Sequence, residues 1–185
     1  EVRLARAWHL MSRPDGLPTS GDFALKEMDL PRLEDGHVHV RNLWLSVDPY
    51  MRGRMNEAKS YIPPFQLDSP MDGGAVGEVV ESRAEGFAPG DLVSHFAGWR
   101  DEAVLPAKTL TRLPSITGAT PQDFLGNLGV TGATAWFGLL DVAQAKAGDI
   151  VFVSAAAGAV GSAVVQIAKA KGMTVIGSAG GKAKC

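Results

Sequence analysis

The sequence predicts a mostly β domain followed by an α/β domain, and two observations support this fold class. Up to about residue 115, short strand-like segments alternate with clusters of turn residues, a spacing typical of a small antiparallel barrel or sandwich. Beyond Pro114, helical patterns lead into one strand–helix–strand unit whose strands are continuously apolar, as in parallel sheets. We therefore expect one domain over residues 1–120 and a second over residues 121–185.

The strands of the first domain are indicated by short apolar or alternating segments. Residues 37–43 alternate polar and apolar side chains, which is the signature of a half-buried strand. Arg13-Pro14-Asp15-Gly16 and Pro89-Gly90-Asp91 mark tight turns. The other expected strands are 5–11, 23–28, 77–81, 92–94 and 103–105.

The second domain begins with helical patterning over 121–128 and 131–142, interrupted at Gly129. Residues 149–154 and 174–177 predict two buried strands, joined by a helix that runs to about Lys171 before a helix-ending Gly172. One apolar face of this helix is spaced at i, i+3, i+4 and i+7, and it consists of Val160, Ala163, Val164 and Ile167. A doubly wound sheet needs about five or six strands, so we expect an α/β domain interrupted after its first βαβ unit.

Composition excludes several classes of function. Eighteen basic and 20 acidic side chains give a net charge of −2, which offers no electrostatic case for nucleic acid or an anionic membrane. No apolar run is long enough to span a bilayer. Cys185 is the single cysteine, so neither a disulfide framework nor a zinc site with two thiolates is possible. These features favour a cytoplasmic protein.

The segment Ala156-Ala157-Gly158-Ala159-Val160-Gly161 lies between the first buried strand and its helix. It matches the dinucleotide-binding fingerprint with alanine in the first glycine position. Gly158 would let the backbone approach a pyrophosphate, and Gly161 would let the helix pack closely on the strand. Free N–H groups at the helix N-terminus would favour the anion. The alternative is an ordinary strand–turn–helix corner.

The residues after the second strand indicate which cofactor would bind. An NAD site usually carries an acidic residue there for the ribose hydroxyls, but residues 177–184 contain no acid and two lysines, Lys182 and Lys184. Cations at this position would pair with a 2′-phosphate, so NADPH is expected rather than NADH. Alternatively, these lysines begin a solvated helix.

Four segments resemble the zinc-free branch of the medium-chain dehydrogenase/reductase superfamily. Within it, the chain is similar to the family of prostaglandin reductases, leukotriene B4 dehydrogenases and alkenal double-bond reductases, including bacterial curcumin-reductase-like members. The most diagnostic match is Asp48-Pro49-Tyr50-Met51-Arg52, within 45–55. The other matching segments are 98–99, 132–140 and 155–161.

The resemblance implies a GroES-like barrel followed by a Rossmann domain, with the active site in the cleft between them. It implies hydride transfer from NADPH to the β-carbon of an α,β-unsaturated ketone or aldehyde, in a homodimer when full length. By motif, Gly158, Ala159, Val160 and Gly161 would contact the pyrophosphate, Lys184 the 2′-phosphate, and Thr134 the nicotinamide region. Val130-Thr131 departs from the Met-Pro pair of relatives, which puts details of the nicotinamide pocket in doubt.

Two alternatives to an enone reductase are a quinone reductase of a sister zinc-free branch and a non-catalytic nucleotide-binding fragment.

Zinc alcohol dehydrogenases of this superfamily carry a Cys after the strand that here ends at Asp48, and a Gly-His-Glu where this chain has Asp72-Gly73-Gly74. Neither ligand is present, so we expect no metal. Without a Lewis acid, conjugate reduction is favoured over alcohol oxidation.

Several polar residues are open to more than one interpretation. Tyr50 could donate a hydrogen bond to a substrate oxygen, or serve structurally with its hydroxyl satisfied. For Arg52 and Arg54 a structural salt bridge is favoured over an anion site. We expect His37 and His39 to face solvent, and we find no partner for His95. The segment 61–65 could be an apolar rim over the substrate or an ordinary surface loop.

Overall fold

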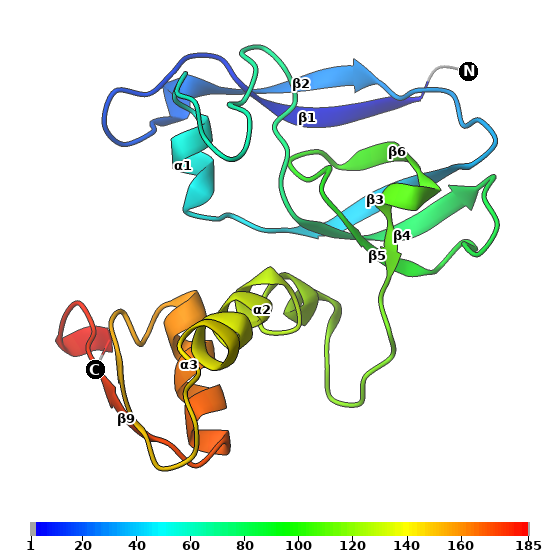
Figure 1. The fold of residues 1–185 in the computed structure, drawn as a ribbon. Coiled ribbons are helices and arrows are strands. Elements are labelled where there is room, and N and C mark those ends of the chain that lie inside the picture. Colours follow the sequence, from blue (N-terminus) through cyan, green and yellow to red (C-terminus); the bar gives the residue numbers. More distant parts are fainter. Residues whose placement is uncertain (1–2, 185) are drawn as a thin grey trace. The chain divides into compact units, whose positions relative to one another are not determined.

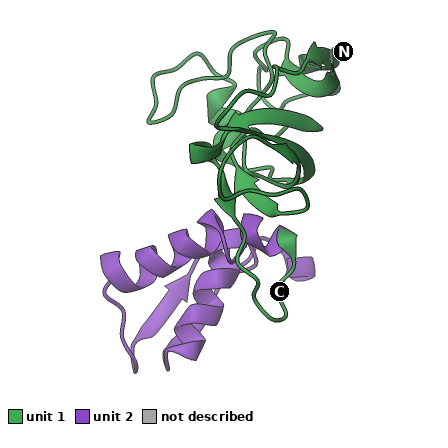
Figure 2. Cartoon of the chain, turned by 90° about the vertical axis from the view of Figure 1, so that its right-hand side faces the viewer, with its two compact units in different colours: residues 1–121 green, residues 122–185 purple. Residues whose placement is uncertain are grey.

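The computed structural model describes residues 3–184, and it separates into two compact units, one up to Pro121 and one from Gln122 (Figure 2). The single cysteine, Cys185, lies outside the described residues.

Unit 1 is a mostly β domain with antiparallel strand pairing throughout its sheets (Figure 1). A hairpin joins β1 (Leu4–Leu10) to β2 (Phe23–Asp29). The second sheet has five strands in the order β6-β3-β4-β5-β7. Its strands are β3 (His37–Leu45), β4 (Ala75–Ser82), β5 (Leu92–His95), β6 (Glu102–Pro106) and β7 (Thr111–Arg112). The antiparallel prediction is confirmed, although β7 was missed because two residues carry no alternation to detect.

Two clusters of buried side chains stabilise unit 1. One gathers Val38 and Val40 of β3 with Val79, Val93 and Leu110. The other packs Met51 of the short helix α1 (Tyr50–Arg54), and Met55 directly after it, against Leu10, Phe65 and Met71. Asp48-Pro49 starts this helix as a turn, with the Met51 amide donating to the Asp48 carbonyl at 3.1 Å. Short 3₁₀ turns cover Ser20–Asp22 and Ala107–Thr109.

Unit 2 contains one βαβ unit with parallel strands, as predicted. Strand β8 (Ile150–Val153) pairs in parallel with β9 (Thr174–Gly177), and α3 (Ala159–Ala170) connects them. Gly172 has a φ of +79°, which is the left-handed conformation expected of a glycine after a helix. A 3₁₀ turn, Lys182–Lys184, follows β9.

The segment before this unit is less regular than expected. The predicted helix over 121–128 is a 3₁₀ helix, Pro121–Leu125. The second, expected over 131–142, is α2 (Val130–Trp136) continued by a π-helix, Phe137–Val142. Gly126 and Gly129 explain the early end of the first, because glycine is a poor helix former.

The prediction that β8 and β9 are buried strands is wrong on one face. Val151 and Val175 face a core built on Leu139, Ala168 and Met173. Ile150, Phe152 and Ile176 on the opposite face are 72%, 66% and 54% exposed, because no described element covers them. Val160 of the predicted helix face is also exposed, and Ala168 is buried at the other end of that face.

Candidate functional sites

The glycine loop connects β8 to α3 in unit 2. Gly158 occupies the N-cap position of α3 in an extended conformation. The first N–H groups of a helix have no intrahelical acceptor, so Ala159, Val160 and Gly161 present amide donors at this end. Their arrangement suits an anionic group such as a phosphate.

Gly161 is required by packing rather than by its backbone angles. A Cβ atom built on Gly161 would lie 2.2 Å from the Ala155 carbonyl oxygen and 3.0 Å from the Ala156 Cα. Both neighbours are backbone and cannot rotate away. Only glycine therefore allows α3 to start this close to the end of β8. At Gly158 a Cβ would lie 3.1 Å from the same oxygen, a tight contact with backbone.

Ala155 is a feature of this loop that the sequence analysis missed. Its φ is +49°, a left-handed conformation that costs a non-glycine residue roughly 1–2 kcal/mol. This residue turns the chain from β8 into the loop. No alternation or composition pattern marks an alanine in that conformation, so the sequence carried no signal for it.

The end of β9 lies beside the loop. The Ala156 amide donates to the Ser178 carbonyl at 2.9 Å, and the Ser178 amide donates to the Val153 carbonyl at 3.0 Å. A Cβ on Gly177 would approach the Ala156 Cβ to 2.7 Å. The segment that carries Lys182 and Lys184 thus leaves the sheet next to the glycine loop.

Lys184 and Thr134 differ in how they are held. Lys184 is exposed, and its side chain forms no ion pair with a described residue. Thr134 is also exposed, but its hydroxyl donates to the Val130 carbonyl one turn earlier on α2, at 2.7 Å. Thr134 therefore needs a rotamer change before that hydroxyl proton could reach a ligand.

Tyr50 begins α1 in unit 1, and its buried hydroxyl has no hydrogen-bond partner among the described residues. The ring is packed as the structural alternative expects, but the hydroxyl is not satisfied. Its ring stacks on Phe96, with 6.5 Å between centroids. Burial, and then the charge of Asp48, raise the pKa of the phenol above its ordinary value of 10.0. Tyr50 thus keeps its proton and offers an unused hydrogen-bond donor.

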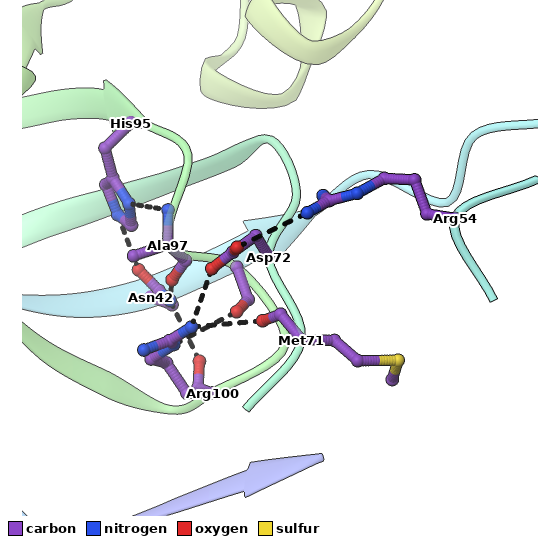
Figure 3. A network of polar contacts seen from close by, with 8 residues as sticks. Asn42, Arg54, Met71, Asp72, His95, Ala97 and Arg100 are labelled. Carbon is purple, nitrogen blue, oxygen red and sulfur yellow. Dashed lines mark hydrogen bonds and ion pairs between the residues drawn. The ribbon is translucent and has the colours of Figure 1, made fainter. Parts of the chain in front are cut away.

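Arg54 lies one helical turn after Tyr50 and is buried. Its guanidinium lies 4.0 Å from the Phe65 ring centroid, donates through Nε to the Pro63 carbonyl at 2.8 Å and approaches Asp72 at 3.7 Å. Figure 3 shows Arg100 on the other side of Asp72, with Nη2 at 3.3 Å from the carboxylate. The predicted salt bridge of Arg54 is confirmed, and Arg100 was missed because its partner is distant in sequence.

Arg52 is structural too, although not through a salt bridge. It donates to the carbonyls of Pro14 and Gly16 and to the side chain of Asn56. In the segment 61–65, Tyr61 is 86% exposed and Phe65 is buried in the α1 core. Only part of this segment is therefore an exposed apolar surface.

The predictions for two histidines are wrong. His39 is 3% exposed rather than facing solvent, and its Nε2 lies 2.6 Å from Glu102 on the neighbouring β6. His95 does have partners: its Nε2 lies 2.8 Å from the Asn42 Oδ1, and the Ala97 amide donates to its Nδ1 at 3.1 Å (Figure 3). The bonds from His39 to Glu102 and from His95 to Asn42 join strands far apart in the chain, which a single sequence does not reveal.

The burial of His95 predicts that the free energy of unfolding depends on pH. Burial, helped by the Arg100 charge, lowers the pKa of His95 from 6.5 to about 4. As the pH falls from 6.5 towards 4, the unfolded chain binds a proton that the folded chain does not. Neutral His95 therefore stabilises the fold fully above pH 6.5, and about 3 kcal/mol of unfolding free energy is lost as the pH falls through 4. Urea unfolding between pH 7 and 4.5 measures most of this loss.

In His95→Gln this fall in unfolding free energy between pH 6.5 and 4.5 should be largely absent. The matched control is His37→Gln, since the His37 ring contacts the Asp35 carbonyl in an exposed position. His37→Gln should show the same fall in unfolding free energy as the parent chain. If His95→Gln also showed this fall, the pH dependence would belong to other groups.

Among the described residues, 3–184, no group of three or more His, Cys, Asp or Glu side chains could hold a metal ion. No helix there is long and apolar enough to cross a membrane.

Comparisons with known proteins agree over nearly the whole chain. Residues 6–113 match the model of the N-terminal domain of oxidoreductase. The NADPH-dependent curcumin reductase of Escherichia coli is 44% identical over 183 residues, covering 97% of this chain and 52% of that protein. Prostaglandin reductase 1 of Mus musculus is 43% identical over 182 residues, covering 97% of this chain and 53% of that protein.

A solved structure extends the similarity to the fold. CurA from Vibrio vulnificus in complex with NADPH superimposes with a TM-score of 0.88 at 44% identity, covering 97% of this chain and 53% of that one. The chain therefore spans about half the length of the relatives it matches. The predicted order, a mostly β domain followed by the first part of an α/β domain, agrees with this match.

Proposed function

The chain belongs to the oxidoreductase family that includes the curcumin and prostaglandin reductases, and from that premise we propose that it is part of an NADPH-dependent enone reductase. The reaction is reduction of the C=C bond of an α,β-unsaturated ketone or aldehyde. The single observation that carries the cofactor assignment is the Gly158–Gly161 loop, with its unpartnered helix N–H groups and its close packing on Ala155.

The cofactor would be held by residues of unit 2. The amides of Ala159, Val160 and Gly161 suit the pyrophosphate, and the exposed ammonium of Lys184 suits the 2′-phosphate. Thr134 belongs to the nicotinamide region by motif. The absence of an acidic residue after β9 supports NADPH over NADH. When bound, NADPH supplies the hydride that adds to the substrate β-carbon.

Tyr50 is the residue of unit 1 best suited to the substrate oxygen. As the β-carbon accepts a hydride, the π electrons move towards the carbonyl oxygen, and the resulting enolate is protonated at the α-carbon. A donor placed at that oxygen stabilises the developing charge. The Tyr50 hydroxyl is buried, keeps its proton and has no described partner.

Tyr50→Phe separates this role from a structural one. Because the hydroxyl has no partner, its removal should change the unfolding free energy by less than about 1 kcal/mol. We expect kcat/KM for an enone to fall about tenfold or more in the full protein, with NADPH affinity unchanged. Lower stability with unchanged turnover would show that the hydroxyl is structural.

Substrate class is tested by comparing rates of NADPH oxidation. An alkenal such as 2-nonenal should be reduced at a higher kcat/KM than a simple quinone. The reverse preference would favour a quinone reductase of the sister zinc-free branch. Binding of NADPH with no turnover of either substrate would favour a non-catalytic nucleotide-binding role.

A further inference from the structure

A polar crevice of about 610 Å³ opens in unit 1, on residues that the proposed reaction does not use. Residues from five places in the chain line it: Arg3 just before β1, the end of β2 with the segment after it, β3, the end of β4 with Arg83 after it, and β6. Its volume falls in the range of small-molecule sites, roughly 300–1,000 Å³.

The wall of the crevice includes a buried histidine with a partner at each ring nitrogen. The Arg3 guanidinium, which can only donate, bonds to the His39 Nδ1 at 3.1 Å. The His39 Nε2 lies 2.6 Å from the Glu102 carboxylate. His39 is thus held in a fixed orientation.

The charged side chains leave an excess of positive charge. Arg3 also bonds to Glu81 at 3.1 Å, which pairs that carboxylate. Asp29 is the other acid of the lining, and Arg32 and Arg83 are the other cations. Neither Arg32 nor Arg83 forms a side-chain hydrogen bond or ion pair with any residue in the described range 3–184. Among the side chains that line the crevice, three guanidiniums thus stand against two carboxylates, and Glu102, which bonds to His39, is not part of the lining.

The rest of the lining is apolar. Leu30, Pro31, Leu33 and Val104 contribute it, and Leu30 is 8% exposed. A polar crevice with an apolar patch suits a ligand that has both a charged group and an apolar body. A carboxylate matches the planar donor fork of arginine in geometry as well as charge.

We propose that this crevice binds a small organic monocarboxylate, with its carboxylate at Arg32 and Arg83 and its apolar body against Leu30 and Leu33. This site lies entirely in unit 1 and involves neither the glycine loop nor Tyr50. It is therefore independent of the nucleotide and enone sites proposed above, and its failure would leave them untouched.

Titration of the ¹⁵N-labelled 185-residue chain with hexanoate tests the proposal. Hexanoate should shift the amide resonances of residues 29–33 and 81–83 with a dissociation constant of about 1 mM, as expected for a ligand of this size. Two other probes separate the contribution of the carboxylate charge from that of the apolar body. Hexanamide lacks the charge and sulfate lacks the apolar body, so each should bind about tenfold more weakly.

Arg32→Gln and Arg83→Gln should each weaken hexanoate binding by about fivefold or more, because each removes a charge-assisted pair. Arg112→Gln is the matched control, since Arg112 pairs with Asp91 outside the crevice. It should leave the affinity unchanged. The proposal is overturned if hexanoate shifts none of these resonances, if hexanamide or sulfate binds as well, or if both crevice variants keep full affinity.

Discussion

Gly161→Ala is expected to disrupt unit 2 and to abolish nucleotide binding. The added methyl group would lie 2.2 Å from the Ala155 carbonyl oxygen and 2.9 Å from its carbon. Since those atoms belong to the backbone that leads from β8 into the loop, α3 must move away from the strand. Overpacking of this kind typically costs about 1–3 kcal/mol. Chemical unfolding followed by amide exchange in α3 and β9 measures the loss.

The matched control is Gly138→Ala in the π-helix of the same unit. A Cβ there meets nothing within 4 Å, and alanine is the better helix former by roughly 0.5–1 kcal/mol. This variant should be as stable as the parent chain or more so. If Gly161→Ala behaved like the control, close packing of α3 on the loop would not be the reason for glycine at this position.

Lys184→Ala is expected to remove most of the preference for NADPH over NADH in the full protein. Loss of a charge-assisted hydrogen bond to a phosphate costs about 1.5–3 kcal/mol, which corresponds to a weakening of NADPH binding by roughly tenfold or more. NADH binding should not change, because NADH carries no 2′-phosphate. Isothermal titration with both cofactors gives the ratio directly.

Lys169→Ala controls for the general effect of removing a positive charge from unit 2. Lys169 is exposed in the last turn of α3, at the opposite end of that helix from the glycine loop. It should leave the ratio of NADPH to NADH affinity as it is. An unchanged ratio in Lys184→Ala would instead mean that Lys184 belongs to a solvated turn.

Local patterns predicted the parts of the fold that depend on neighbouring residues. The bounds of β9 agree residue by residue with the predicted strand, and Gly172 ends the helix as expected. The glycine loop was located because its constraint is also local: Gly161 must clear the carbonyl of Ala155, six residues earlier. Such short-range requirements are visible in a single sequence.

The parts that escaped prediction depend on pairs distant in the chain. Buried His39 is satisfied by Glu102 on the neighbouring strand, 63 residues away, and His95 by Asn42, 53 residues away. The link from Arg54 through Asp72 to Arg100 is of the same kind. Each of these side chains looks like an ordinary surface residue until the strand register is known.

The unpartnered hydroxyl of Tyr50 is a different case. Its segment was recognisable as a motif, but a motif cannot show whether a buried hydroxyl finds an acceptor. In the structure it has none among the described residues, and buried polar groups usually do. Because the hydroxyl has no described partner, Tyr50→Phe can distinguish a substrate role from a structural one.

The most direct test of enone reduction uses NADPH dideuterated at the nicotinamide C4, with 2-nonenal as substrate and the full protein as catalyst. We predict nonanal that carries one deuterium, on the β-carbon, with the aldehyde intact. An allylic alcohol with deuterium on C1, the former carbonyl carbon, and with the C=C bond retained would contradict the assignment.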